Sequence, residues 1–448
     1  MSAVRGHAVA DQVTEFVHDL RWDDVPADVR RHFGLLLCDL AAVSVAGRAA
    51  PAARIAAGHA TEVYGGDAAT ALYDGRRLSV PGAAWANGVL ANALDYDDGH
   101  RLTKGHPGAI VVPAMLALAE AQGASPTELF EATLVAYEVA IRAGLMLHAR
   151  ERQYHASAAW GALGVAAGAA RILGLDAAAL RHAVGIAEYH APIALMSRAV
   201  TDPAMTKDAC GWGGMIGASS ALLAQRGFTG LDSEFMLATD DLALGERWEV
   251  RELYLKPYPC CRWSQPAIDA ALSLRGAIDS PEQIVGVTVR TFAIAESLSR
   301  RQPQCTEEMQ YSLVWPVATA LARGAFGVDE VLRGFGDPLA AKLAGCTSVS
   351  IDEGYSDAFP AQRLTDVVLE LDDGRLLRSG PREAEGEPQS AGWEAVVLGK
   401  ARRYLSAADT PPPPGVPPVP PRGEVRGTPD ELVALLAFAC TSYTAMES

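Results

Sequence analysis

Three carboxylates and two imidazoles crowd into twelve residues, between two segments that are apolar enough to form buried helices. The acids are Asp95, Asp97 and Asp98, and the imidazoles are His100 and His106. A solvated loop would account for such charges, and each acid alone is more simply a helix cap or a surface charge. The apolar flanks nevertheless predict that this loop is held against a core. Acids and imidazoles in a partly desolvated pocket have shifted pKa values, which proton-transfer chemistry requires.

Two further segments each place one reactive group before a helix. His155 lies in residues 152–157, ahead of an alanine-rich helix, and the structural alternative is that it only flanks this helix while Ser157 caps it. Lys207 precedes the glycine-rich residues 211–214. A lone lysine is usually a surface charge, but this one stands near apolar residues. The free amides at a helix start favour a bound carboxylate in either case.

The fourth segment, residues 254–263, combines cations, aromatic rings and two prolines. It contains Lys256, Tyr258, Cys261 and Arg262. The prolines restrict the backbone, so the flanking side chains would form a rigid basic wall. A structural kink between two domains is the alternative interpretation, and the prolines would serve that role equally well.

Together the four segments supply two kinds of group. Cations that could hold carboxylates stand at Lys104, Lys207, Lys256 and Arg262, and acid/base groups stand at Asp95, His106 and His155. This set suits removal of a proton next to a carboxylate, because a base must be positioned and the developing charge must be neutralised. No serine lies in a GxSxG context, and no nucleotide-binding loop or metal-ligand motif is convincing. We therefore expect no metal and no organic cofactor.

The bulk composition limits the class of protein. With 448 residues, the chain should form two domains. A net charge of −16 argues against nucleic-acid binding, although a local field can still attract an anionic substrate. Seven scattered cysteines without paired spacing predict reduced thiols. Because we find neither a signal pattern nor a long apolar run, we expect a cytoplasmic protein without membrane contact.

The pattern of elements divides the chain into a helical part and a mixed part. Helical periodicity dominates to about residue 275, including a helix that begins with the capping sequence Ser125-Pro126-Thr127-Glu128. Alternating strands at 284–290 and 366–371 then predict a smaller α+β unit. We therefore expect a mainly α protein with a helical domain at 1–275 and an α+β lid domain at 276–400. Residues 401–448 read as a proline-rich linker, 410–421, and a final helix that returns to the helical domain.

An ordered set of motifs resembles the MmgE/PrpD family from about residue 10 to residue 375. The motifs are Ala93-Leu94-Asp95-Tyr96-Asp97-Asp98, His106-Pro107-Gly108, Tyr137-Glu138-Val139, Gly227-Phe228-Thr229-Gly230 and Lys256-Pro257-Tyr258-Pro259-Cys260-Cys261-Arg262. The family contains 2-methylcitrate and alkylcitrate dehydratases, cis-aconitate decarboxylase and iminodisuccinate epimerase. The resemblance implies a large helical domain with an α+β lid, usually in a homodimer, and no cofactor.

The resemblance also implies which residues line the pocket. Carried over by position, the catalytic set is Asp95, His106, His155, Lys207 and Lys256. His155 or Asp95 would be the base, His106 the acid that protonates the leaving group, and the lysines carboxylate clamps. The substrate-binding residues would be Lys104, Tyr258, Cys261 and Arg262.

Two departures from the family pattern bear on the reaction. Cis-aconitate decarboxylases carry a histidine where Cys261 stands and a threonine where Gly99 stands. The sequence therefore favours a dehydratase that removes water from a hydroxylated di- or tricarboxylate such as a methylcitrate or alkylcitrate. The alternatives are an epimerase of an iminodisuccinate-like dicarboxylate, a decarboxylase of a cis-aconitate-like acid, and a helical scaffold without activity. The chain leaves the identity of the substrate open.

Overall fold

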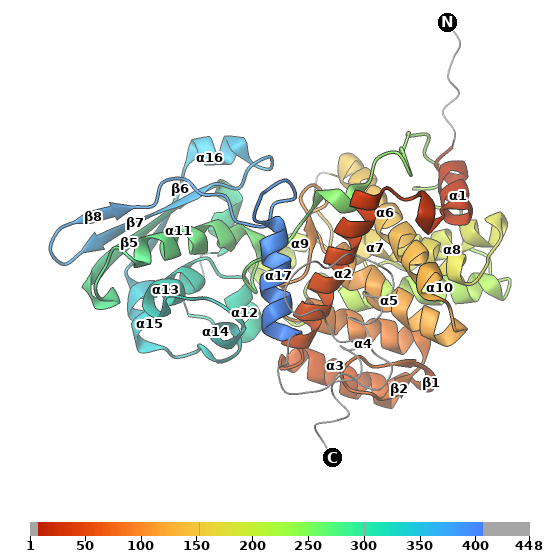
Figure 1. Cartoon of the computed structure of the whole chain (residues 1–448), viewed down its shortest axis with the longest axis horizontal. Coiled ribbons are helices and arrows are strands. Elements are labelled where there is room, and N and C mark those ends of the chain that lie inside the picture. Colours follow the sequence, from red (N-terminus) through yellow and green to blue (C-terminus); the bar gives the residue numbers. More distant parts are fainter. Residues whose placement is uncertain (1–7, 152, 299–301, 406–448) are drawn as a thin grey trace, which may run out of the picture.

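Two domains of different architecture lie side by side in the computed structural model (Figure 1), which describes residues 8–151, 153–298 and 302–405. The larger one is helical, and the smaller one combines helices with a sheet, so the predicted mainly α fold with an α+β domain is confirmed. The proline-rich linker and the final helix that we expect after residue 405 lie outside the described residues. The six described cysteines, all but Cys440, are free thiols.

The helical domain is built from the first ten α-helices and from α17. Their bounds are α1 Val9–Asp19, α2 Ala27–Gly47, α3 Pro51–Val63, α4 Val80–Asn92, α5 Pro107–Gln122, α6 Pro126–Arg150, α7 Ala158–Ile172, α8 Ala177–His190, α9 Met196–Thr201, α10 Cys210–Gln225 and α17 Trp393–Tyr404. Short antiparallel strands pair β1 (Gly65–Thr70) with β2 (Arg77–Leu78) and β3 (Gly99–His100) with β4 (Leu253–Tyr254). The predicted capping box at the start of α6 is present.

Small residues let these helices approach one another closely. A Cβ atom added to Gly164 of α7 would lie 2.2 Å from the carbonyl oxygen of Ala136 on α6, and one added to Gly168 would lie 2.6 Å from that of Ala132. The glycines of α7 therefore allow close helix packing. The loop after α4 is close-packed as well, because a Cβ atom added to Gly105 would lie 2.5 Å from the Trp160 ring.

The smaller domain contains a four-stranded sheet in the order β6-β5-β7-β8. The strands are β5 Ile284–Thr291, β6 Thr347–Ile351, β7 Thr365–Leu371 and β8 Leu376–Arg378, and only β5 and β6 run parallel. The helices are α11 Gln265–Arg275, α12 Thr306–Gln310, α13 Val314–Arg323, α14 Val328–Arg333, α15 Pro338–Gly345 and α16 Glu353–Ala358. Alternate residues of β5 are buried, as the predicted strand pattern requires. Short 3₁₀-helices occupy Trp22–Asp24, Glu249–Glu252, Arg262–Ser264, Pro281–Gln283 and Ala293–Leu298.

Two helices pack in a different domain from the one in which the predicted domain bounds place them. Helix α11 packs on α13 and β7, so it belongs to the smaller domain although it precedes residue 276. Helix α17 packs along α2 of the helical domain, where Figure 1 shows it between the two halves of the molecule. The chain therefore crosses between the domains twice, and the second crossing follows the sheet.

A buried ion pair fixes α17 to α2. The Nζ atom of Lys400 lies 2.9 Å from Asp39 Oδ1 and donates a hydrogen bond to the carbonyl oxygen of Tyr96 at 2.9 Å. We expect Lys400→Met to lower the free energy of unfolding by about 3–5 kcal/mol, because it leaves a buried carboxylate unpaired. Urea denaturation followed by circular dichroism measures this change. Lys342→Met, at an exposed lysine of α15, is the matched control, and an equal loss in both variants would contradict the role of the pair.

None of the described helices is long and apolar enough by itself to cross a membrane. Helices α2 and α3 would meet that criterion only together, across a bend of 90°.

Candidate active site

The pairing of two short strands brings the first and fourth reactive segments together. Gly99 of β3 pairs with Tyr254 of β4, and this register places Lys256 beside the loop that follows α4. Asp95, Lys104 and Lys207 all have left-handed backbone angles, with φ values of 51°, 51° and 40°. Such angles are unfavourable for residues with a Cβ atom and persist where the surrounding structure imposes them, often at functional sites.

His106 lies between two carboxylates at the start of α5. Its Nε2 atom is 3.2 Å from Asp95 Oδ1, and its Nδ1 atom is 3.2 Å from Asp97 Oδ2. Burial opposes the charge on the imidazole, but the charge and hydrogen bond of Asp97 and the charge of Asp95 together outweigh it and raise the pKa of His106 to about 9. Burial likewise opposes the charge on Asp97, yet His106 and Lys256 lower the pKa of that carboxyl to about 2. At neutral pH the site therefore holds an imidazolium between carboxylates.

Asp98 has a different function from its two neighbours. Its Oδ1 atom accepts a hydrogen bond from the backbone N–H of Gly108 at 3.0 Å, and its Oδ2 atom accepts one from the hydroxyl of Tyr137 at 2.9 Å. Burial and the charge of Asp97 raise the pKa of Asp98 to about 7. Asp98 thus anchors the loop to α5 and α6. His100 is similarly used within the fold, since its Nε2 atom lies 3.5 Å from Glu249 Oε2.

Lys256 completes the central cluster. Its Nζ atom donates hydrogen bonds to Asp95 Oδ1 at 2.8 Å and to the Asp95 carbonyl oxygen at 2.9 Å. Burial disfavours its charge, but the Asp95 carboxylate outweighs that effect, and the pKa of Lys256 is raised above its usual value. Asp95 consequently carries two cationic partners, Lys256 and His106.

A small cavity of about 40 Å³ adjoins this cluster. Six of the predicted site residues line it: Asp95, Lys104, His106, Lys256, Cys261 and Arg262. Ligand pockets of drug size have volumes of about 300–1,000 Å³, so a di- or tricarboxylate can enter only if side chains or the smaller domain move. Burial raises the pKa of the Cys261 thiol to about 12, so this wall of the cavity is neutral.

The remaining predicted residues do not line this cavity. The Tyr258 hydroxyl donates a hydrogen bond to Asp269 at 2.6 Å. Lys207 donates to the carbonyl oxygen of Asn92 and lines a separate, mainly apolar cavity of about 200 Å³; burial lowers its pKa. His155 lies one residue after Tyr154, whose carbonyl oxygen accepts a hydrogen bond from the N–H of Met196, a residue of the cavity wall.

The neighbourhood of His155 shows how the second segment reaches the site. Ser157 makes no capping hydrogen bond to α7, so the capping alternative is wrong. Its hydroxyl instead accepts from the N–H of His106 at 2.9 Å and donates to Asp208 Oδ1 at 3.0 Å. The backbone N–H of His155 donates to His148 Nε2 at 3.1 Å, while Nδ1 of His155 is buried without a hydrogen-bond partner among the described residues.

Arg262 lines the cavity, but it also ties the chain together. Its Nη1 and Nη2 atoms donate to the carbonyl oxygens of Leu255, Glu385 and Ala384 and to Glu387 Oε1, at 2.8–3.1 Å. Its guanidinium group is therefore largely committed to holding the segment that follows the sheet. This geometry assigns it a positioning role.

The sequence did not predict that four further titratable residues line the cavity. They are Asp208, Tyr254, Tyr311 and Arg363. Asp208 follows the predicted Lys207 directly, so the lysine could have drawn attention to it. Tyr254 begins the fourth segment, as the residue that pairs with Gly99. Neither Tyr311 nor Arg363 belongs to a motif, and only the three-dimensional arrangement brings them to the site.

Asp95, Asp97 and His106 are the one trio of potential metal ligands found in the part of the chain that the structure describes, with ligand atoms within 4.8 Å of one another. Metal binding would require His106 to lose a proton that its carboxylate neighbours stabilise. The ammonium group of Lys256 already neutralises Asp95. The donor set therefore fits proton transfer better than metal coordination.

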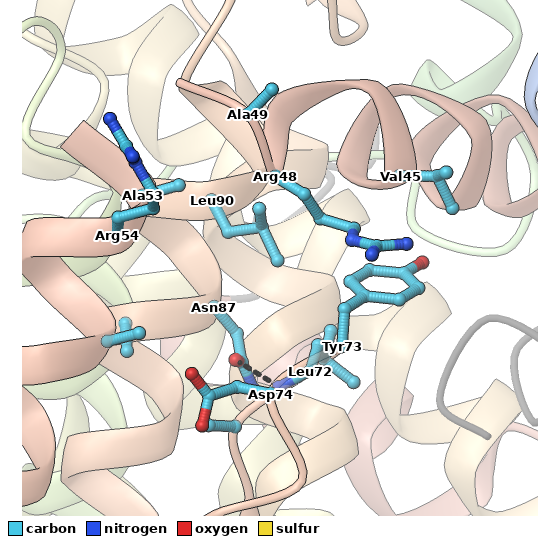
Figure 2. A pocket seen from close by; sticks show the side chains of 13 residues that line it. Val45, Arg48, Ala49, Ala53, Arg54, Leu72, Tyr73, Asp74, Asn87 and Leu90 are labelled. Atoms are coloured by element: carbon cyan, nitrogen blue, oxygen red, sulfur yellow. Dashed lines mark hydrogen bonds between the residues drawn. The ribbon is translucent and has the colours of Figure 1, made fainter. Parts of the chain in front are cut away.

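A larger cavity of about 360 Å³ lies elsewhere in the helical domain, between α2, α3 and α4. Figure 2 shows the guanidinium group of Arg48 over the ring of Tyr73, 5.7 Å from its centre. Asn87 accepts a hydrogen bond from the N–H of Leu72 and donates one to the carbonyl oxygen of Thr70. These polar groups serve the local fold, so volume alone does not make this cavity the active site.

One protein class combines these features: a helical domain, a smaller α+β domain and an acid–imidazole cluster between them. The chain belongs to the MmgE/PrpD family: the MmgE/PrpD N-terminal domain matches residues 11–242, and the MmgE/PrpD C-terminal domain matches residues 258–410. The family resemblance of the sequence is thereby confirmed.

Several curated relatives share the name cis-aconitate decarboxylase. The chain is 25% identical to the cis-aconitate decarboxylase-like protein oryM of Aspergillus oryzae over 318 residues, which is 63% of this chain and 66% of the relative. It is 39% identical to human cis-aconitate decarboxylase over 123 residues, 26% of this chain and 25% of the relative. It is 25% identical to the enzyme of Aspergillus terreus over 299 residues, 60% of each chain. Each match spans less than two thirds of the relative's length.

Proposed function

We propose that this protein is a cofactor-independent lyase that removes water from a hydroxylated di- or tricarboxylate. The observation that carries the proposal is the His106 imidazolium, held between Asp95 and Asp97 beside a cavity lined by Lys104 and Lys256. A buried group that stays protonated at neutral pH can act as a general acid. The nearby cations can stabilise the negative charge that develops on a substrate carboxylate.

In the proposed reaction, a base takes the proton from the carbon next to one carboxylate. The electron pair of that C–H bond forms the carbon–carbon double bond, and the C–O bond of the hydroxyl group breaks. His106 donates its proton to the departing oxygen, so water leaves. The base then releases its proton to solvent, and His106 takes up a proton from solvent, so both groups return to their starting states. Each turnover thus yields an unsaturated acid and one water.

We assign the role of base to His155 rather than Asp95; His155 lies outside the wall of the present cavity and would join it when the cavity opens for the substrate. Both alternatives came from the family resemblance, but Asp95 already accepts hydrogen bonds from Lys256 and lies against His106. His155 retains a ring nitrogen that no described residue engages. Lys207 supports the loop through Asn92, so in this proposal it positions the acidic residues instead of clamping the substrate.

Decarboxylation of a cis-aconitate-like acid is the second candidate, because the relatives are named for it. The acid His106 would then protonate carbon as carbon dioxide leaves. Two features weigh against this reaction. The neutral Cys261 thiol stands where those enzymes carry a histidine, and a Cβ atom at Gly99 would lie 2.4 Å from the Tyr254 ring, which leaves no room for their threonine.

The decisive experiment incubates the full chain with hydroxylated di- and tricarboxylates, including 2-methylcitrate, and separately with cis-aconitate. We expect the ultraviolet absorbance of a conjugated acid to appear with the hydroxy acids, and no carbon dioxide to be released from cis-aconitate. Release of carbon dioxide would establish the second candidate. In deuterated water, incorporation of deuterium with inversion of the carbon centre, but without loss of water, would indicate an epimerase. No reaction with any acid would overturn the proposal.

From the family resemblance we also propose a cytoplasmic homodimer.

A further inference from the structure

Two buried cations from different domains line this cavity. Lys104 follows β3 in the helical domain, and Arg363 precedes β7 in the smaller domain. Their exposed fractions are 8% and 2%, and both side chains line the cavity. The Nζ atom of Lys104 and the Nε atom of Arg363 have no hydrogen-bond partner within the described ranges.

Two aromatic rings lie beside the Lys104 ammonium group. Its Nζ atom lies 3.8 Å from the centre of the Tyr154 ring and 5.1 Å from that of Phe359. Ring faces attract a cation, but they leave its hydrogen-bond donors unused. Burial and then the charge of Arg363 lower the pKa of Lys104 to about 8, which reflects the missing counter-charge.

Arg363 shares a carboxylate partner with a second arginine. Glu387 Oε1 accepts hydrogen bonds from Arg363 Nη1 at 3.2 Å and from Arg262 Nη2 at 2.8 Å. Both guanidinium groups lie over the ring of Tyr254, about 5 Å from its centre. One carboxylate thus serves two arginines, while no carboxylate in the described part of the chain pairs with Lys104. This corner of the cavity carries an excess of positive charge.

We infer that Lys104 and Arg363 form a subsite for a second carboxylate of the substrate, remote from the reacting carbon and shared between the two domains. The inference rests on the proposed function and assigns a binding place to the second carboxylate of its di- or tricarboxylate substrate. One would lie near His106 and Lys256, and the other would supply the missing counter-charge. Direct contacts already join the domains here, since Arg101 Nη1 donates to the carbonyl oxygen of Ala361 at 2.6 Å. A bound carboxylate would strengthen this connection.

The test combines a change in the protein with a change in the ligand. Binding is measured by calorimetry with tricarballylate, a saturated tricarboxylate, and with its monoamides, because an acid with neither a hydroxyl group nor a carbon–carbon double bond cannot undergo the proposed elimination or the alternative decarboxylation. We expect Lys104→Met to weaken binding of the tricarboxylate by about tenfold to a hundredfold, the usual range for a charged hydrogen bond. One monoamide, the one lacking the remote carboxylate, should bind the variant and the unaltered protein alike. Arg363→Met should behave in the same way, and Lys104→Arg should retain most of the affinity.

Lys342→Met, at an exposed lysine outside the cavity, is the control for loss of charge and should bind as the unaltered protein does. Circular dichroism separates the loss of a subsite from a failure to fold. The proposed subsite is wrong if Lys104→Met weakens the binding of tricarballylate and of every monoamide equally. It is also wrong if Lys104→Met leaves the binding of all of them unchanged. The subsite is equally wrong if the unaltered protein binds no polycarboxylate. Binding that depends on Lys104 without turnover of any hydroxy acid would overturn only the proposed reaction.

Discussion

His106→Gln is expected to lower kcat by about 10²–10⁴-fold while leaving KM within a few-fold of its original value. Positioned proton transfer contributes a rate factor of this size. Glutamine can still donate one hydrogen bond toward Asp95 or Asp97, but it has no proton to give to a departing oxygen. Steady-state kinetics measures both constants, with the hydroxy acid on which the incubation experiment finds activity. His190→Gln, at the exposed end of α8, is the matched control and should retain full activity.

The pH dependence provides a second readout of the same residue. The active form is the imidazolium, whose pKa is about 9, so kcat should fall as pH rises through that value. The stability of the folded protein depends on pH in the same direction. Because the pKa of His106 is raised in the folded state, protonation of His106 stabilises the fold fully below the ordinary pKa of 6.5, and this stabilisation is lost as pH rises through about 9. An alkaline limb that persists in His106→Gln would show that another group is the acid.

The features that the sequence predicted well are governed by local contacts. The capping box of α6 involves residues three apart, and β5 shows its burial pattern within a single strand. The same holds for the central cluster, because Asp95, Asp97 and His106 are separated by one short loop and the start of α5. Such groups are brought together by the turn that contains them. Their proximity could therefore be predicted before the fold was known.

Side-chain direction within a motif could not be predicted. Lys256, Tyr258 and Arg262 share one proline-restricted segment, but Lys256 reaches Asp95, Tyr258 turns to Asp269, and Arg262 bonds to the segment after the sheet. Left-handed backbone angles at Asp95 and Lys207 set other directions, and residue types other than glycine give little sign of such angles. The composition of the segment indicates charge, whereas the backbone decides where that charge points.

Contacts between the domains were the least accessible to sequence reasoning. Arg363 comes from a connection before β7 and reaches the cavity only because the smaller domain lies against residues 101–104. Its distance in sequence from Lys104 is more than half of the chain, and it belongs to no motif. Similarly, α17 packs on α2 through Lys400 and Asp39, which no periodicity relates. Long-range ion pairs of this kind depend on the completed fold.

Lys256→Met is expected to abolish measurable turnover and to lower the free energy of unfolding by about 3–5 kcal/mol, because Asp95 would keep a buried charge without its ammonium partner. Asp95 and Lys256 are each only 1% exposed, so solvent cannot replace the lost interaction. Urea denaturation measures the stability, and the kinetic assay measures the activity. Loss of the lysine would also remove a charge that lowers the pKa of His106, so any residual activity should extend to higher pH.

The double variant Lys256→Met with Asp95→Asn separates stability from catalysis. Asparagine removes the buried carboxylate charge that has lost its ammonium partner, and its amide oxygen can still accept a hydrogen bond from His106, so we expect most of the lost stability to return. Activity should not return, since the ammonium group that stabilises the developing carboxylate charge is still missing. A double-mutant cycle built from the four proteins gives the coupling energy between the two residues. If the double variant recovered turnover, Lys256 would be a structural counter-ion of Asp95 and would have no part in the chemistry.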